Sequence, residues 1–244
     1  MKRTLPLLLA LFLVPLGAHA GFHVDYERGV VWSGYNDVGI PGDVGTRFSL
    51  VDDLDTESDG YFRLRVSYTF SGKHTLSGLY APLSLRANGS VEDPLVFEEV
   101  TFPGGTELDA TYTFNSYRLT YRYEFEPRGR LEYGLGFTAK IRDAVVRVEG
   151  GGLESEKSNV GFVPLVNFRA RWAFSERVAL LLHGDALAAP QGRAEDVLLA
   201  LTYRPREMVE LRLGYRVVEG GADNDEVYNF AWLNYALLAL SVSF

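Results

Sequence analysis

The sequence of 244 residues contains no cysteine. Disulfide bonds, thiol catalysis and thiolate ligation of metals are therefore excluded. Helical signals are scarce, because few segments repeat apolar residues every three to four positions. Beyond the first twenty residues, no apolar run approaches the roughly 20 residues that a membrane-crossing helix needs. These absences exclude two classes, disulfide-stabilised domains and helical membrane proteins.

The first residues have the pattern of an export signal. Lys2 and Arg3 precede the apolar run "TLPLLLALFLVPLG", and Ala18-His19-Ala20 follows it. A basic start, a short apolar run and small residues two apart are typical of a secretory signal peptide. The run is short and contains two prolines, which argues against a membrane anchor helix. We therefore predict a signal peptide over 1–20, cleaved after Ala20, and one mature domain over 21–244.

An excess of positive charge is missing as well. Of the 24 basic residues, Lys2 and Arg3 precede the cleavage site, so 22 basic and 32 acidic residues remain, a net charge of −10. This charge argues against nucleic acid as a partner. No motif has the spacing of a metal or phosphate site, and we expect neither a metal nor a cofactor.

What the sequence has is a repeated two-residue alternation of apolar and polar side chains. In "YFRLRVSYTF" (61–70) every second position from Phe62 to Phe70 is apolar, and the positions between them are polar. The segments "SYRLTYRYEF" (116–125), "VNFRARWAF" (166–174) and "VELRLGYRV" (209–217) repeat this pattern. Such alternation predicts β-strands with one apolar and one polar face.

Two all-β architectures have such strands. A soluble sandwich buries the apolar face, whereas a transmembrane barrel turns it toward lipid and its polar face toward a lumen. The barrel is favoured because aromatic residues gather at strand ends and several strands exceed the roughly 9–11 residues needed to cross a bilayer. Connections also alternate between short (71–73, 127–129, 175–177, 205–207) and long (92–107, 149–159, 188–194, 219–227). We predict a transmembrane antiparallel up-and-down β-barrel.

The strand count is most consistent with ten. The predicted strands are 22–34, 58–70, 74–91, 108–126, 130–148, 160–174, 178–188, 194–204, 208–218 and 228–244. Twelve strands would result if a hairpin in "TRFSLVDDL" (46–54) entered the wall, and eight if two segments were discarded. Pro82 and Pro164 fall inside predicted strands. We expect both on the outer side of the bilayer, where a bulge can be hydrated.

The sequence ends with "YALLALSVSF". In a closed barrel the last strand pairs with the first, so a terminal aromatic residue can anchor at the periplasmic interface. Phe244, preceded by Val242 and Leu240 on the same face, resembles the C-terminal signature of bacterial outer-membrane β-barrels. The resemblance implies export to a Gram-negative outer membrane, recognition by the barrel assembly machinery, and contact with outer-membrane lipid and lipopolysaccharide. It identifies this class and no family of known function.

The polar strand faces predict a charged lumen. A barrel near eight strands has an interior that side chains can fill, and ten strands make it only slightly wider. Because arginine offers five donors and keeps its charge, ion pairs across the lumen would close it. The alternative is a narrow anion-preferring conduit, since the basic groups outnumber the acids. The predicted lumen residues are Arg63, Arg65, Arg118, Arg122, Glu124, Glu132, Lys140, Arg142, Arg169, Arg171, Asp185, Asp196, Glu210, Arg212 and Arg216.

One pair of residues suggests chemistry. His183 and Asp185 are two apart and project to the same face, and a carboxylate beside an imidazole orients it and raises its basicity. Omptin-type outer-membrane proteases have ten strands and an Asp–His pair with acidic partners, a role open here to residues 52, 53 or 55, all aspartates. No stretch matches the omptin motifs, however, and the His-x-Ser pair of lipid A deacylases is missing. We expect a structural barrel or narrow conduit, with an omptin-like or lipid-modifying hydrolase as the alternative.

Overall fold

The computed structural model describes residues 21–190 and 192–244, and the predicted signal peptide lies outside them. Within these ranges, no helix is long and apolar enough to cross a membrane, a finding that does not bear on strands. The described strands are β1 (Gly21–Gly39), β2 (Phe48–Ser49), β3 (Leu54–Thr56), β4 (Asp59–Phe70), β5 (His74–Ala81), β6 (Ser84–Ser90), β7 (Leu95–Phe97), β8 (Val100–Phe102), β9 (Glu107–Glu124), β10 (Leu131–Gly150), β11 (Leu153–Ala173), β12 (Val178–Ala189), β13 (Gly192–Arg206), β14 (Val209–Asp223) and β15 (Tyr228–Ser243).

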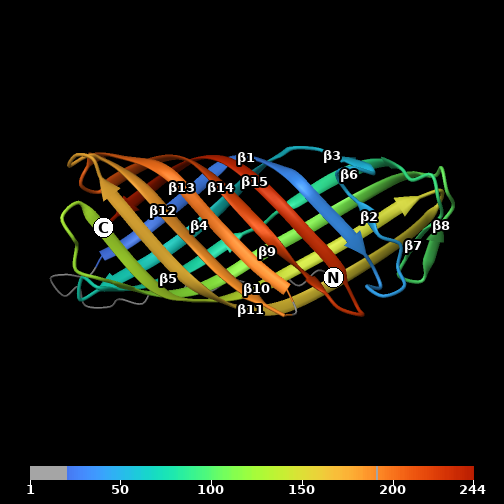
Figure 1. Ribbon diagram of the computed structural model, residues 1–244. Coiled ribbons are helices and arrows are strands. Elements are labelled where there is room, and N and C mark those ends of the chain that lie inside the picture. Colours follow the sequence, from blue (N-terminus) through green and yellow to red (C-terminus); the bar gives the residue numbers. More distant parts are fainter. Residues whose placement is uncertain (1–20, 191) are drawn as a thin grey trace, which may run out of the picture.

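The long strands form a closed antiparallel barrel (Figure 1). Neighbours follow the order β10, β11, β12, β13, β14, β15, β1, β4, β5 and β9, and β9 pairs with β10 to complete the circle. The short strand β3 extends β4, and β6 extends β5, because β6 pairs with both β3 and β9. The wall therefore has ten strands, which confirms the predicted count.

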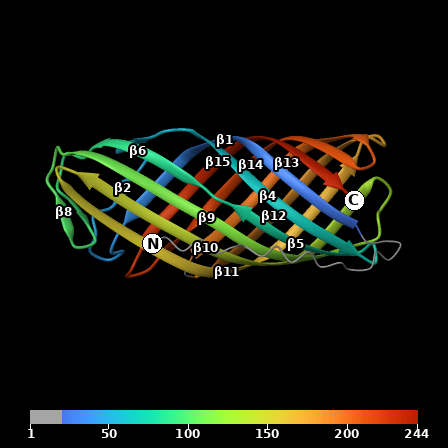
Figure 2. The ribbon, with the colours of Figure 1, turned by 180° about the vertical axis from the view of Figure 1, so that it is seen from behind.

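The two ends of the barrel differ. At one end, which we call the turn end, the Phe244 amide donates to the Phe22 carbonyl at 2.8 Å. The connections β4–β5, β9–β10, β11–β12 and β13–β14 also lie there. At the opposite end, the loop end, strands β6, β9, β10 and β11 project beyond the rest of the wall (Figures 1 and 2). The hairpin of β7 and β8 lies at this projecting edge.

Two predicted loops are strands instead. Residues 149–159 belong to a hairpin in which β10 and β11 pair up to Gly150 and Leu153. Gly151 and Gly152 reverse the chain with φ values of 59° and 81°, a conformation that glycine adopts without steric cost. Residues 188–189 and 192–194 likewise belong to the paired ends of β12 and β13. The loop prediction was wrong because glycine-rich composition also fits a tight hairpin turn.

The predicted hairpin over 46–54 does not form. Phe48 pairs with Val38 on β1, whereas Leu54 pairs with Gly89 on β6. The two short strands β2 and β3 therefore join different parts of the wall and add no pair of strands to it.

The outward face of the long strands is apolar toward the turn end and polar toward the loop end, and the inward face shows the reverse. On β9, the outward Leu119 is 56% exposed and the inward Thr120 is 1% exposed. Nearer the loop end the inward residues are apolar, since Leu108 and Ala110 are each 2% exposed, and the outward Asp109 is polar. An apolar outer surface with a polar interior suits lipid, and the reverse suits water. The wall thus continues past the apolar belt.

An apolar cap fills the lumen at the loop end. It consists of side chains that are at most 4% exposed: Ile40, Phe48, Leu50, Leu95, Phe97 and Phe102. The rings of Phe48 and Phe97 meet edge to face with 6.4 Å between centroids. The amide of Thr46 donates to the Val96 carbonyl at 2.9 Å, which fixes the β7–β8 hairpin to the 40–50 segment. Sequence analysis missed this cap because it treated both segments as outer loops.

The two strand prolines have separate explanations. Pro82 lies in the break between β5 and β6, where the Phe114 amide still reaches the Leu83 carbonyl at 2.9 Å. Pro164 lies inside β11, two residues beyond the last β11–β12 pair, Val166 with Ala186. Proline lacks an amide hydrogen and is confined to free sheet edges or bulges. Pro164 is therefore tolerated because that edge of β11 is free, without the bulge we expected. It lies between the exposed apolar residues Phe162 and Val166, so it belongs to the apolar belt and not to the segment beyond it that we predicted.

Candidate functional site in the lumen

A buried cluster of six charged side chains crosses the middle of the lumen. Its members, which we call the central cluster, are Glu27, Arg63, Arg118, Asp185, Asp196 and Arg216. They come from β1, β4, β9, β12, β13 and β14, and no side chain among them is more than 6% exposed. Strand alternation turns each of them inward, and barrel closure then brings them together.

Asp196 is the centre of this cluster. Its Oδ2 lies 2.7 Å from Nη2 of Arg63 and 2.7 Å from Nη2 of Arg118, and its Oδ1 accepts from Arg216. Arg216 also holds Glu27, with 2.7 Å between Nη2 and Oε2. Three arginines and three carboxylates therefore balance in charge and share most of their donors and acceptors. Buried ion pairs persist when each charge is compensated in this way.

Asp185 joins the cluster to the neighbouring strands. Its Oδ2 lies 2.7 Å from Nη1 of Arg118. Its Oδ1 accepts from the Thr138 hydroxyl at 2.5 Å and from the Asn167 amide at 2.8 Å. Contacts from β10 and β11 thereby complete a belt of polar bonds around most of the wall.

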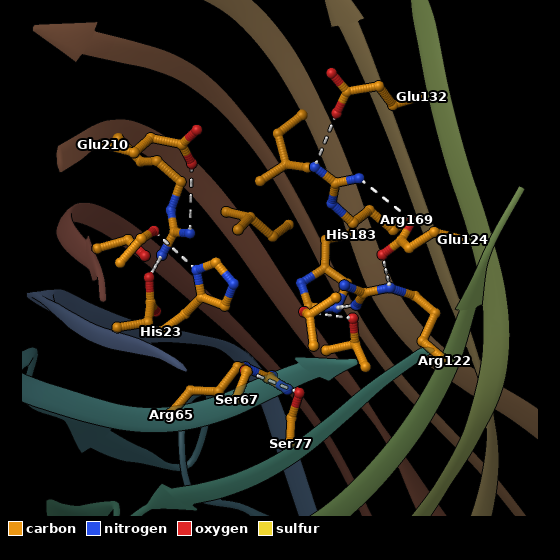
Figure 3. A pocket seen from close by; sticks show the side chains of 18 of the residues that line it. His23, Arg65, Ser67, Ser77, Arg122, Glu124, Glu132, Arg169, His183 and Glu210 are labelled. Atoms are coloured by element: carbon orange, nitrogen blue, oxygen red, sulfur yellow. Dashed lines mark hydrogen bonds and ion pairs between the residues drawn. The ribbon is translucent and has the colours of Figure 1, made fainter. Parts of the chain in front are cut away.

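Below the cluster, a cavity of about 650 Å³ opens toward the turn end, and we call it the vestibule. Figure 3 shows Arg122 and Arg169 directed toward Glu124 and Glu132 on one side of it. Arg122 Nε lies 2.6 Å from Glu124 Oε1. Arg171 Nη1 lies 2.8 Å from Glu132 Oε1, so the Glu132 carboxylate links β10 to β11.

The opposite side of the vestibule carries a second group of ion pairs. Glu210 accepts from Arg204 at 2.8 Å and lies 3.9 Å from Arg212, which also binds Asp25. At the rim, outside the strands, a hydrogen bond with Glu126 raises the pKa of Lys73. Arg65 lines the vestibule without a carboxylate within 4.0 Å among the described residues.

The remaining predicted lumen residues, Lys140 and Arg142, lie on the loop-end side of the central cluster. Lys140 is 4% exposed, and its Nζ lies 4.7 Å from the centroid of the Phe114 ring. Arg142 binds the Asn159 side chain, and its Nε has no partner among the described residues. They line a separate cavity of about 370 Å³.

The structure does not assemble the hydrolase site that the sequence suggested. His183 lines the vestibule beside Arg122 (Figure 3). Its Nε2 lies 3.4 Å from Arg122 Nη1 and 3.4 Å from Asn167 Nδ2. Asp185 is occupied by Arg118, Thr138 and Asn167, and no hydrogen bond joins it to His183 in the described chain. The candidate acid Asp55 pairs with β6 near the loop end, while His183 contacts β9 near the turn end.

Sequence analysis missed two lumen carboxylates, Asp25 and Glu27. Both lie on β1 between the outward residues Val24, Tyr26 and Arg28. The alternation that was applied to the other strands would have turned them inward. With them included, the residues lining the vestibule number eight Lys or Arg against seven Asp or Glu, which is close to balance. The predicted excess of positive charge is therefore small where the lumen is open.

No group of three or more His, Asp or Glu side chains in residues 21–190 and 192–244 is arranged to hold a metal ion. No protein-family model matches the sequence. No curated protein matches it either.

Solved structures of bacterial outer-membrane barrels resemble the fold. The outer membrane protease OmpT from Escherichia coli is 8% identical with a TM-score of 0.58, covering 92% of this chain and 97% of its own. An outer membrane channel from Pseudomonas putida F1 is 11% identical with a TM-score of 0.47, covering 94% and 97%. The attachment invasion locus protein Ail of Yersinia pestis is 10% identical with a TM-score of 0.40, covering 91% and 99%. The chain thus has the fold of the bacterial outer-membrane β-barrels, which confirms the predicted class, and these identities support no transfer of function.

Proposed function

We propose that this protein is an integral outer-membrane barrel whose lumen is closed, so that it acts as a structural barrel with a vestibule open to the periplasm. The observation that carries the proposal is the burial of the central cluster, whose side chains are at most 6% exposed. The apolar cap provides a second layer of closure toward the loop end. An open pore would need hydrated charges at these levels.

The narrow conduit remains the second candidate, and one observation favours it. Arg65 lines the vestibule without an ion-pair partner within 4.0 Å in the described residues. Arg65 is one inward position from Arg63 of the central cluster on β4, and an unpaired arginine at this inner end of the vestibule attracts anions. The near balance of charges around the vestibule argues against strong anion selectivity, however.

Single-channel conductance in a planar bilayer tests the proposal. We expect the refolded native barrel to be silent. A variant with Arg118→Ser and Asp185→Ser keeps two arginines and two carboxylates in the cluster, and it should also be silent because the cap remains. A second variant replaces 91–106 by Asn-Gly, a two-residue turn suited to joining the paired Ser90 and Glu107.

Only the barrel that combines the two serine substitutions with the replacement of 91–106 should produce steady current steps. Steady anion-selective steps from the native barrel would overturn the closed-lumen proposal and support the conduit. Silence of the combined variant would contradict the assignment of closure to these two layers. Hydrolysis of peptide or lipid substrates by the native barrel, lost in His183→Ala, would support the enzyme alternative instead.

A further inference from the structure

The wall of the barrel is incomplete between β11 and β12. Pairing between these strands runs from Ala173 with Ala179 to Val166 with Ala186 and stops there. β11 continues to Leu153 along β10, so one edge of residues 153–165 pairs with no strand in the described part of the chain. Figures 1 and 2 show β10 and β11 projecting past the β12–β13 hairpin.

Part of this free edge lies at the level of the apolar belt. Val160 and Phe162 point outward from β11 and are 69% and 63% exposed. Unpaired backbone groups facing hydrocarbon cost several kcal/mol each, so free edges occur at membrane depth only where they line a cavity or contact protein. Pro164 removes one such donor, because it has no amide hydrogen. The gap is therefore the mouth of a cavity in the wall.

The cavity of about 370 Å³ lies behind this gap. Its lining includes both the inward Gly161 and Val163 and the outward Phe162 and Pro164, so it wraps around the free edge of β11. Leu187 lies across the mouth on β12, and Phe114 and Leu233 lie deeper. The volume falls within the roughly 300–1,000 Å³ of small-molecule sites, and apolar side chains form most of the entrance.

The inner end of the cavity is cationic. Lys140 is 4% exposed and has no ion-pair or hydrogen-bond partner among the described residues, apart from its approach to the Phe114 ring. Arg142 binds the neutral Asn159 and has no carboxylate within 4.0 Å in the described part of the chain. The one carboxylate in the lining, Glu219, is already held by Arg193 at 2.6 Å and by the Tyr35 hydroxyl at 2.5 Å. A buried cation without a counter-ion is costly, so this end favours an anion.

From this arrangement we propose that the cavity binds a single-chain anionic amphiphile that enters sideways from the membrane. Its carboxylate or phosphate lies against Lys140 and Arg142, and its hydrocarbon chain extends past Phe114 to the mouth at Phe162 and Leu187. This route does not pass through the central cluster, which lies closer to the turn end than the cavity does. Thr138, which binds Asp185 of the cluster, is one inward position nearer the turn end on β10 than Lys140. Binding here does not depend on conductance along the barrel axis.

Binding of radiolabelled dodecanoate to the barrel in phosphatidylcholine nanodiscs tests the proposal, with dodecanol as the uncharged probe and empty nanodiscs subtracted. Lys140→Met removes the charge but keeps most of the side-chain length. Ala194→Phe fills the cavity from β13. The matched control is Arg147→Met on β10, whose side chain is 40% exposed and lies outside the lining. Folding of each variant is checked by heat-dependent mobility on gels.

We expect one saturable dodecanoate site in the native barrel and in Arg147→Met. Lys140→Met should weaken dodecanoate by about tenfold, as expected for loss of a charged hydrogen bond, and should leave dodecanol nearly unchanged. Ala194→Phe should abolish binding of both probes. Equal dodecanoate affinity in the native barrel and both cavity variants would overturn the proposal, as would no saturable binding at all.

A photoreactive dodecanoate locates the site independently. We expect cross-links at 162–164 and at Leu187. Cross-links confined to the outer faces of β4 and β9 would mean adsorption to the lipid-facing belt and would overturn the lateral site.

Discussion

Arg63 and Asp196 meet across the lumen with 2.7 Å between Nη2 and Oδ2, although they are 133 residues apart in the sequence. Their strands, β4 and β13, are separated in the wall by β1, β15 and β14. The contact therefore depends on closure of the barrel and cannot form between neighbouring strands. Because both side chains are at most 6% exposed, the loss of one leaves the other as a buried charge.

Asp196→Ala should strongly destabilise the barrel. It leaves Arg63, Arg118 and Arg216 without their shared carboxylate. Removing one partner of a buried ion pair costs about 3–5 kcal/mol, mostly through the uncompensated charge that remains. The measurement is the free energy of unfolding in urea for the barrel refolded into lipid vesicles.

Glu154→Ala is the matched control for this loss. Its partner Arg147 lies 2.8 Å away, but the two side chains are 40% and 56% exposed. Exposed pairs contribute about 0–1 kcal/mol. Equal effects of Asp196→Ala and Glu154→Ala would contradict the burial that we assign to the central cluster.

The inversion of the alternation along β9 predicts two different outcomes for arginine on the same outward face. Leu119→Arg places a charge in the apolar belt, which costs about 2–4 kcal/mol near the bilayer midplane. Asp109→Arg places it beyond the belt, where the cost falls to about 0–1 kcal/mol. Unfolding of both variants in vesicles measures the difference, and a similar cost at both sites would mean that the apolar belt extends to the loop end.

The fold could be predicted because each wall strand carries its own signal. Phe62, Leu64 and Val66 alternate with arginine and serine in the sequence, and this local pattern fixes which face meets lipid. The number of wall strands follows from counting such segments. Strand ends were harder, because Gly150 to Gly152 fit a loop and a tight hairpin equally well by composition.

The arrangement inside the lumen could be predicted only as a set of residues. Alternation turns Arg118 and Asp185 inward, but which carboxylate each arginine binds depends on the stagger of strands that are far apart in the wall. The apolar cap depends on segments such as Leu95–Phe97 folding back into the barrel, and no period in the sequence reports that. The gap beside β11 depends on unequal strand lengths, which the predicted boundaries did not resolve.

The proposed orientation in the outer membrane is testable by cysteine labelling, since the natural sequence contains no cysteine and gives no background. Ser67 lines the vestibule, and Asp109 is exposed near the loop end. In intact cells, a membrane-impermeant maleimide should modify Asp109→Cys and leave Ser67→Cys unmodified until the outer membrane is permeabilised. Modification of Ser67→Cys alone in intact cells would mean that the vestibule faces outward.

Substitution of Phe244 tests whether the C-terminal residue serves assembly in the cell or the stability of the folded barrel. Phe244 is 66% exposed, so little packing is lost in Phe244→Ala, and the hydrogen bond from its backbone amide to the Phe22 carbonyl is kept. We expect refolding into lipid vesicles to be nearly unchanged, while the amount of assembled barrel in cells falls severalfold because the proposed recognition by the assembly machinery is weakened. Heat-dependent gel mobility of membrane fractions measures the assembled amount. Phe125→Ala, which removes another partly exposed aromatic residue beside the β9–β10 turn, is the control. An equal loss in both variants would mean that aromatic anchoring at the turn end, and no terminal signal, limits assembly.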